Sequence, residues 1–156
     1  MPALLLAALA LAAAVPVRAE PIPAGFDAAG ADRQAIEDLL RTYAAAVSSK
    51  NQALFETLLL NKDIPFSGTW AVRGGGGTAN YESFRRGVFE GSPFTQSFRD
   101  VRISRDGPLA DVSLVFVNRG PGGDGWGWKT MLLLKVDGRW KIASEFYTGH
   151  ELPKGS

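Results

Sequence analysis

The sequence contains no cysteine and a single histidine, His150. These absences exclude disulfide scaffolds, thiolate zinc sites, cysteine nucleophiles and multi-histidine metal centres. An excess of one charge is also missing, because 17 Lys and Arg residues balance 16 Asp and Glu residues to a net charge of +1. No basic field is available to bind nucleic acid through counterion release. We therefore expect no metal, no cofactor and no nucleic-acid partner.

Sequence motifs of nucleophilic catalysis and phosphate binding are lacking too. There is no Ser-His-Asp order, no G-x-S-x-G and no S-x-x-K, and the glycine run 74–77 is not followed by the lysine of a P-loop. The loop 119–125 holds one carboxylate, Asp124, too few for a calcium loop. The chain of 156 residues is long enough for one domain with a buried core, but not for two.

The amino-terminal segment has the pattern of a secretory signal. An apolar run, 3–15, is broken by Pro16 and followed by small residues at the positions that signal peptidase reads. We predict a signal peptide over 1–19, a linker over 20–30, one domain over 31–151 and a tail over 152–156. The protein is then exported, periplasmic or secreted, with no stable membrane anchor after cleavage; the alternative is an uncleaved anchor.

Hydrophobic periodicity predicts three helices followed by a sheet. The first helix runs from about Asp32, its expected N-cap, to about Ser49; the second follows a cap at Asn51, and the third ends near Gly91. Period-two alternation predicts four late strands after an early strand at 64–70: 98–104, 110–118, 126–136 and 139–148. This order predicts an α+β domain with three N-terminal helices packed on one face of a curved antiparallel β-sheet.

The last hairpin predicts a cavity. If Asp137-Gly138 is a two-residue turn, Thr130 lies opposite Glu145 and Trp128 lies opposite Tyr147. One face would then carry Trp128, Thr130, Leu132, Leu134, Ala143, Glu145 and Tyr147. The other face would carry Lys129, Met131, Leu133, Trp140, Ile142, Ser144 and Phe146. Both faces are substantially apolar, so the helices would cover one face and a second copy of the chain, in a homodimer, the other.

The face with Glu145 has the composition of a ligand cavity, mainly apolar with a few polar groups. Burial would raise the pKa of the Glu145 carboxyl, which suits an acid or base near neutral pH. The alternatives are a plain core with Glu145 at an exposed strand end, or an ion pair with Lys141 or Lys129. Aromatic side chains could stack a flat ligand there, although Phe66 is expected to be core and Trp126 could contact a ligand or a partner.

Two segments resemble the NTF2-like superfamily, with its SnoaL-like and lumazine-binding-like branches the most similar. They are A-I-E-D-L-L-R-T-Y-A-A-A-V-S-S-K-N-Q-A-L-F, similar to its first two helices, and L-L-L-K-V-D-G-R-W-K-I-A-S, similar to its closing hairpin. The resemblance covers about 31–151. It implies a cone-shaped α+β domain, a pocket between sheet and helices, and dimerisation through the outer face of the sheet.

The same superfamily includes ketosteroid isomerases, and Tyr43 matches their first-helix tyrosine. Their catalytic base would fall on Ser67 and their second acid near Met131 or Leu132, none of which can replace a carboxylate. Dehydratase relatives use His and Asp in the pocket, whereas this chain has only His150, expected at the surface or at a pocket mouth.

We therefore expect an exported domain that binds a small apolar or aromatic molecule without catalysis. The predicted ligand-binding residues are Tyr43, Trp70, Trp128, Thr130, Leu132, Glu145 and Tyr147. Two alternatives remain: an isomerase or dehydratase-like enzyme using Glu145 with Tyr43, or a protein-interaction module of the cell envelope using the loop that bears Trp126.

Overall fold

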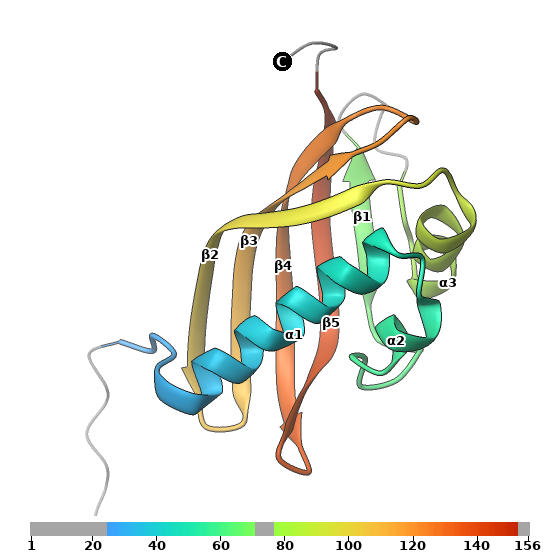
Figure 1. The fold of residues 1–156 in the computed structure, drawn as a ribbon. Helices are drawn as coiled ribbons and strands as arrows, with labels where there is room; N and C mark the ends of the chain where they lie inside the picture. The colour runs from blue at the N-terminus through green and yellow to red at the C-terminus, as the bar shows by residue number, and fades with distance from the viewer. Residues whose placement is uncertain (1–24, 71–76, 153–156) are drawn as a thin grey trace, which may run out of the picture.

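The computed structural model describes residues 25–70 and 77–152, which form helices on one face of a curved sheet (Figure 1). The helices, in chain order, are α1 (Gly30–Ser48), α2 (Gln52–Glu56), α3 (Tyr81–Arg85) and the π-helix η2 (Arg86–Glu90). The strands are β1 (Phe66–Trp70), β2 (Thr95–Asp106), β3 (Leu109–Arg119), β4 (Gly125–Val136) and β5 (Arg139–Glu151). The predicted α+β class with helices packed on a curved sheet is confirmed.

The five strands lie in the order β1-β5-β4-β3-β2, and consecutive strands from β2 to β5 pair antiparallel. The early strand β1 instead pairs parallel with β5, with Phe66 opposite Glu145. A wholly antiparallel sheet was predicted, and this edge is the exception. The two strands are far apart in the sequence, so no tight turn imposes an antiparallel arrangement on them.

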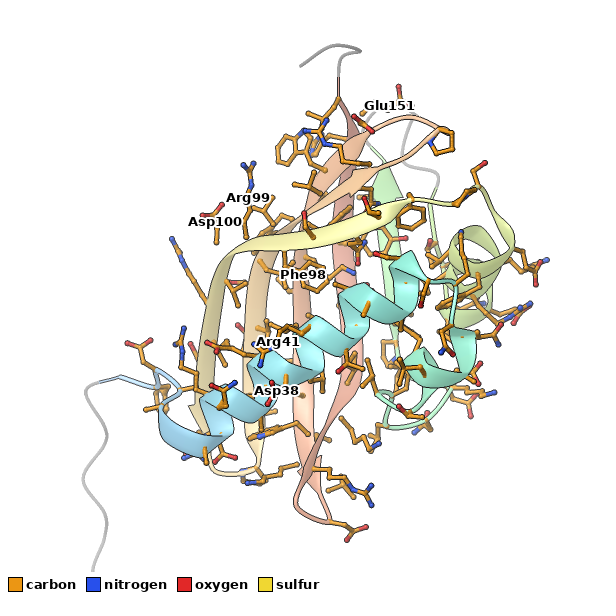
Figure 2. All side chains as sticks on the ribbon, in the orientation of Figure 1. Asp38, Arg41, Phe98, Arg99, Asp100 and Glu151 are labelled. Atoms are coloured by element: carbon orange, nitrogen blue, oxygen red, sulfur yellow. The ribbon has the colours of Figure 1, made fainter. Side chains whose placement is uncertain are left out.

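Helix α1 crosses the sheet and buries one stripe of its surface against it (Figure 1). The buried stripe has helical spacing: Ile36, Leu39, Leu40, Tyr43, Ala46 and Val47. Asp38 and Arg41 lie on the opposite side, toward solvent (Figure 2). This amphipathic pattern lets the sheet cover the apolar side of the helix, and that packing stabilises the helix.

Helix α1 begins two residues before its predicted cap, at Gly30 after Ala29. The predicted cap, Asp32, lies instead within the first turn. Its carboxylate accepts hydrogen bonds from Lys135 Nζ at 2.7 Å and Trp140 Nε1 at 3.1 Å. Both bonds go to Oδ1, while Arg105 Nη1 of β2 lies 3.1 Å from Oδ2, so contacts to β2 and to the β4–β5 hairpin occupy the oxygens that a cap would offer to the helix.

The start of α2 and the end of the third helix agree with the sequence prediction. Asn51 Oδ1 accepts a hydrogen bond from the Leu54 backbone N–H at 3.0 Å, so Asn51 caps α2 as expected. Leu54 itself is 37% exposed, because a helix of five residues presents few side chains to the core. Helix α3 passes directly into η2, which ends at Glu90 with Gly91 as its C-cap, so the third helix ends near Gly91 as predicted.

Strand β2 is bent by a β-bulge between Arg99 and Arg102, where Asp100 has a φ of 54°. The first half of the strand consequently turns across the helix-bearing side of the sheet (Figure 1). Phe98 points toward α1, whereas Arg99 and Asp100 point outward at the bend (Figure 2). The bend makes the sheet concave at this end, which is where the candidate site lies.

The predicted signal peptide, the first part of the linker (20–24), most of the glycine run (74–76) and the end of the tail (153–156) lie outside the described residues. From the linker, Asp27 forms a bridge with Ser104, and Ala28 is buried. Within ranges 25–70 and 77–152, no helix has the length and hydrophobicity needed to span a bilayer.

Candidate functional site

The β4–β5 hairpin turns where the sequence predicts it. Val136 pairs with Arg139, and Asp137 and Gly138 both have positive φ, 49° and 75°, as a two-residue turn of this twist requires. Leu134 pairs with Lys141, as counting from this two-residue turn requires. The prediction of a two-residue bend at Asp137-Gly138 is therefore correct.

Further from the turn, a β-bulge changes the register by one residue. Leu133 pairs with Ile142, but Leu132 pairs with Ser144, so Ala143 is the extra residue on β5. Glu145 consequently lies opposite Met131 rather than Thr130, and Tyr147 lies opposite Lys129 rather than Trp128. A single inserted residue reverses which side chains of β5 face the helices.

The predicted cavity face is therefore only half correct. Glu145 points inward and is fully buried, and Tyr147 packs against the core, as predicted. Trp128 and Leu132 lie on the outer face, 54% and 45% exposed, and Thr130 shares that face. These three residues do not join Glu145, because β4 keeps its alternation while the bulge shifts β5.

In their place, Lys129 faces the helices and forms a buried cluster with Glu145 and Tyr43. Lys129 Nζ lies 2.7 Å from Glu145 Oε1 and donates a hydrogen bond to the Tyr43 hydroxyl oxygen at 2.5 Å. The Tyr43 hydroxyl in turn donates to Glu145 Oε1 at 2.9 Å. Side-chain exposure is 2% for Lys129 and 0% for Glu145, so the pair is withdrawn from water.

Burial perturbs all three groups of the cluster. It lowers the pKa of the Lys129 ammonium and raises the pKa of the Glu145 carboxyl, and the attraction between the two opposes both shifts. Burial and the neighbouring Glu145 charge raise the pKa of Tyr43 well above its usual value. Among the described residues, Glu145 Oε2 has no hydrogen-bond partner. The pair is thus held in an environment that favours uncharged forms.

Aromatic rings surround the ammonium. Lys129 Nζ lies 4.3 Å from the centroid of the Tyr43 ring and 5.4 Å from that of Phe116. The rings of Tyr147 and Phe98 follow at 5.7 and 5.8 Å. Such rings stabilise a cation through their faces and exclude water from its surroundings.

Lys129 and Tyr147 line a cavity of about 1060 Å³ between the sheet, the β3–β4 loop and the α3–η2 helices. Its aromatic wall is formed by Phe84, Phe94 and Phe116, and its polar lining includes Gln96, Asn118 and Glu151. Glu151 marks its position at the end of β5 (Figure 2). Because Glu145 and Tyr43 do not line the cavity, Lys129 connects it with the buried carboxyl.

Tyr147 is positioned by Gly68 on the neighbouring strand. The two residues are paired in the sheet, and a Cβ at Gly68 would lie 2.1 Å from Cζ of the Tyr147 ring. The Tyr147 hydroxyl forms a hydrogen bond with Thr78 Oγ1 at 2.5 Å. Burial raises the pKa of Tyr147 to about 12, so this phenol stays protonated at neutral pH.

The described rings of the remaining aromatic candidates are not among those around Lys129. Trp70 is the last residue of β1, and its backbone pairs with Gly149 of β5. The Trp70 side chain lies outside the described part of the structure. His150 lies near the end of β5, and the Trp126 ring stacks on it with the two ring centroids 4.5 Å apart. Phe66 is buried in the core, as expected.

Lys129 was considered in the sequence only as an ion-pair partner of Glu145, and that pairing is confirmed. The other candidate partner, Lys141, contacts the Thr57 carbonyl oxygen instead. The sequence signal for Lys129 was an isolated cation within an apolar strand. Its role at the cavity was missed because the predicted register placed it on the opposite face from Glu145.

A family profile described as a SnoaL-like domain matches residues 36–146, which include every member of the buried cluster. The chain belongs to the SnoaL-like family. The predicted NTF2-like resemblance is thereby confirmed at the level of family and fold. No curated protein matches the sequence.

Solved structures share the fold of this SnoaL-like domain at low sequence identity. An NTF2-like protein of unknown function from Shewanella baltica is 18% identical, with 78% of this chain and 95% of that chain covered and a TM-score of 0.59. An NTF2-like protein from Cytophaga hutchinsonii is 17% identical, with 77% and 98% covered and a TM-score of 0.62. A candidate scytalone dehydratase from Novosphingobium aromaticivorans is 16% identical, with 80% and 94% covered and a TM-score of 0.58.

Chemically, the SnoaL-like domain offers a cation at a cavity wall, with a carboxyl and a phenol behind it. No described residues form a group of three or more His, Asp or Glu side chains placed to hold a metal ion. The cluster can donate hydrogen bonds to a ligand, balance its charge, and move protons over short distances.

Proposed function

We propose that this SnoaL-like domain binds a small apolar or aromatic molecule in the cavity between sheet and helices, as a binding protein rather than through turnover. The observation that carries the proposal is Lys129, a buried cation on the wall of a cavity with both aromatic and polar lining. Ligand sites commonly combine apolar and aromatic walls with placed polar groups. The volume of about 1060 Å³ suits a drug-sized ligand.

The position of Lys129 favours a ligand that carries an oxygen acceptor. Tyr43 and Glu145 use two of the three N–H groups of the ammonium. The third can donate to a carbonyl, carboxylate or phenolate oxygen. Burying an ion pair costs several kcal/mol per ion, a cost that an apolar core of the same shape avoids. We therefore assign the cluster to ligand recognition rather than to stability.

Ligand-induced shifts of backbone amide NMR signals test the proposal. Naphthalene carrying a carboxylate, an aldehyde or no polar group forms a graded set of probes. We expect saturable shifts at Gly120 and Gly125, which line the cavity, with the acceptor-bearing probes binding more tightly. The variant Leu132→Ala, on the outer face, is the matched control and should bind equally well. If no probe shifts these amides, the proposal is wrong.

Catalysis by Glu145 and Tyr43 remains a second candidate function. It requires the two side chains to lie next to each other, and they are joined by a hydrogen bond. One similar structure belongs to a candidate scytalone dehydratase. Glu145, however, lies behind Lys129 and does not line the cavity. Exchange of deuterium from D₂O into an enolisable aryl ketone, lost in Glu145→Gln, would favour the enzyme.

We also propose export and a homodimer. Export rests on the apolar run 3–15, and mass spectrometry of the mature N-terminus in a Gram-negative host tests it.

The dimer rests on the outer sheet face, where Trp128, Leu132 and Phe146 are all about half exposed. A protein-interaction role for Trp126 is less favoured, since its ring is already stacked on His150.

A further inference from the structure

The cluster has the parts needed to form an imine. Lys129 supplies an amine at the cavity, and Glu145 Oε1 lies 2.7 Å from its nitrogen. The Tyr43 hydroxyl lies within hydrogen-bond distance of both groups. Imine formation from a lysine needs an unprotonated amine, a nearby acid and little water.

An unprotonated amine is accessible in this setting. In a dry pocket, a carboxylate and an ammonium in contact can exchange the proton between them, which leaves a neutral amine and a carboxylic acid. Burial shifts the pKa of Lys129 down and that of Glu145 up, and both shifts favour this neutral form. Lysines become nucleophilic when they are desolvated in an apolar pocket.

We propose that Lys129 captures aromatic or apolar aldehydes and ketones as a reversible protonated imine, with Glu145 as the proton donor and acceptor. This inference rests on the proposed function and names the class of ligand that the cavity takes. The aromatic wall of Phe84, Phe94 and Phe116 suits a carbonyl joined to a flat apolar group.

The atoms and charges balance within the cluster. The Lys129 nitrogen adds to the carbonyl carbon, the carbon–oxygen π pair moves to oxygen, and Glu145 protonates that oxygen and then takes a proton from nitrogen. The resulting hydroxyl group receives a proton from Glu145 and leaves as water, while the nitrogen lone pair forms the C=N bond. The product is a cationic imine beside a Glu145 carboxylate, which reproduces the charges of the original ion pair.

The aromatic rings around Lys129 have a further consequence for the imine. They lie between 4.3 and 5.8 Å from the nitrogen, so they stabilise the cationic imine as they stabilise the ammonium. They also exclude water, which slows hydrolysis of the C=N bond. The bound form is therefore expected to persist without further reaction.

Reductive trapping tests the inference. The full chain is incubated with cinnamaldehyde and sodium cyanoborohydride, which reduces protonated imines to stable amines. Peptide mass mapping should show a gain equal to the probe less one oxygen atom on Lys129. Labelling there should exceed that of the exposed Lys62 several-fold, because Lys129 is desolvated and Lys62 is not.

A matched variant and a matched ligand separate the outcomes. Lys129→Met with Glu145→Gln removes both charges together, so the fold is kept and circular dichroism verifies it; only the cavity adduct should disappear. Cinnamyl alcohol has the same shape but cannot form an imine. If the alcohol shifts the cavity amides and cinnamaldehyde gives no Lys129 adduct, this inference is overturned while the proposed function stands. If neither compound binds, both fail.

Discussion

Removing only one member of the Lys129–Glu145 pair should destabilise the fold far more than removing both. The nitrogen–oxygen distance of 2.7 Å corresponds to about 6 kcal/mol of Coulomb attraction at an effective dielectric constant of about 20, before desolvation is counted. Lys129→Met leaves Glu145 buried with Tyr43 as its only donor among the described residues. We expect a loss of about 3–5 kcal/mol in the free energy of unfolding at neutral pH.

The double variant should recover most of that loss. Lys129→Met with Glu145→Gln replaces both charges by neutral groups of similar volume, and such replacements range from neutral to stabilising by about 1–4 kcal/mol. Urea unfolding of the wild type, both single variants and the double variant gives the coupling energy directly. Additive losses in the double variant would show that the pair is not one energetic unit and would refute this reasoning.

The pH dependence of Lys129→Met adds an independent check. Burial raises the pKa of Glu145 above its ordinary 4.5, and removal of the cation strengthens that shift. A group whose pKa is raised on folding stabilises the fold below its unfolded pKa, and this contribution is lost as pH rises through the folded pKa. The deficit of Lys129→Met relative to wild type should therefore shrink as pH falls toward 4.5. A deficit that is constant between pH 7 and 4.5 would contradict a charged Glu145 in the variant.

Three further predictions concern neighbouring features. Gly68→Ala should cost about 1–3 kcal/mol in urea unfolding, since its Cβ would overlap the Tyr147 ring; an unchanged midpoint would contradict the close approach. Leu132→Glu should convert a dimer into monomers in sedimentation velocity while changing monomer stability by no more than about 0.5 kcal/mol. A sedimentation coefficient unaltered by this change would argue against the sheet-face dimer. Asn51→Ala should lower the free energy of unfolding by about 1 kcal/mol, because the Leu54 N–H loses its capping acceptor; Asn51→Ser, which keeps a side-chain oxygen, should retain most of that stability.

Most of the fold could be predicted from the sequence because its patterns are local. The apolar stripe that includes Ile36 and Val47 identifies α1, and Asn51 marks the start of α2. The dipeptide Asp137-Gly138 locates the last turn, because only a few residue pairs suit two consecutive positive φ angles. Each of these signals depends on residues within a few positions of one another.

The candidate site could be predicted only in part, because its register depends on a distant interaction. Nothing local distinguishes Ala143 as an extra residue; the bulge lies just before Glu145, where β5 begins to pair with β1 as well as with β4. Glu145 and Tyr147 were placed inward by the predicted register. The same register turned Lys129 outward, so the cation opposite Tyr147 was not recognised as part of the site. One unpredicted bulge residue was enough to place Lys129, rather than Trp128, on the same face of the sheet as Glu145.

The extra residue in β5 also divides that strand into two segments with opposite tolerance to charge. Between Trp140 and Ile142, the even-numbered positions face the protein interior, whereas from Glu145 to Tyr147 the odd-numbered positions do so. A systematic scan with aspartate should therefore show a sensitivity pattern that changes phase at Ala143, and deletion of Ala143 alone should remove the bulge while leaving Glu145 opposite Met131 on the inner face.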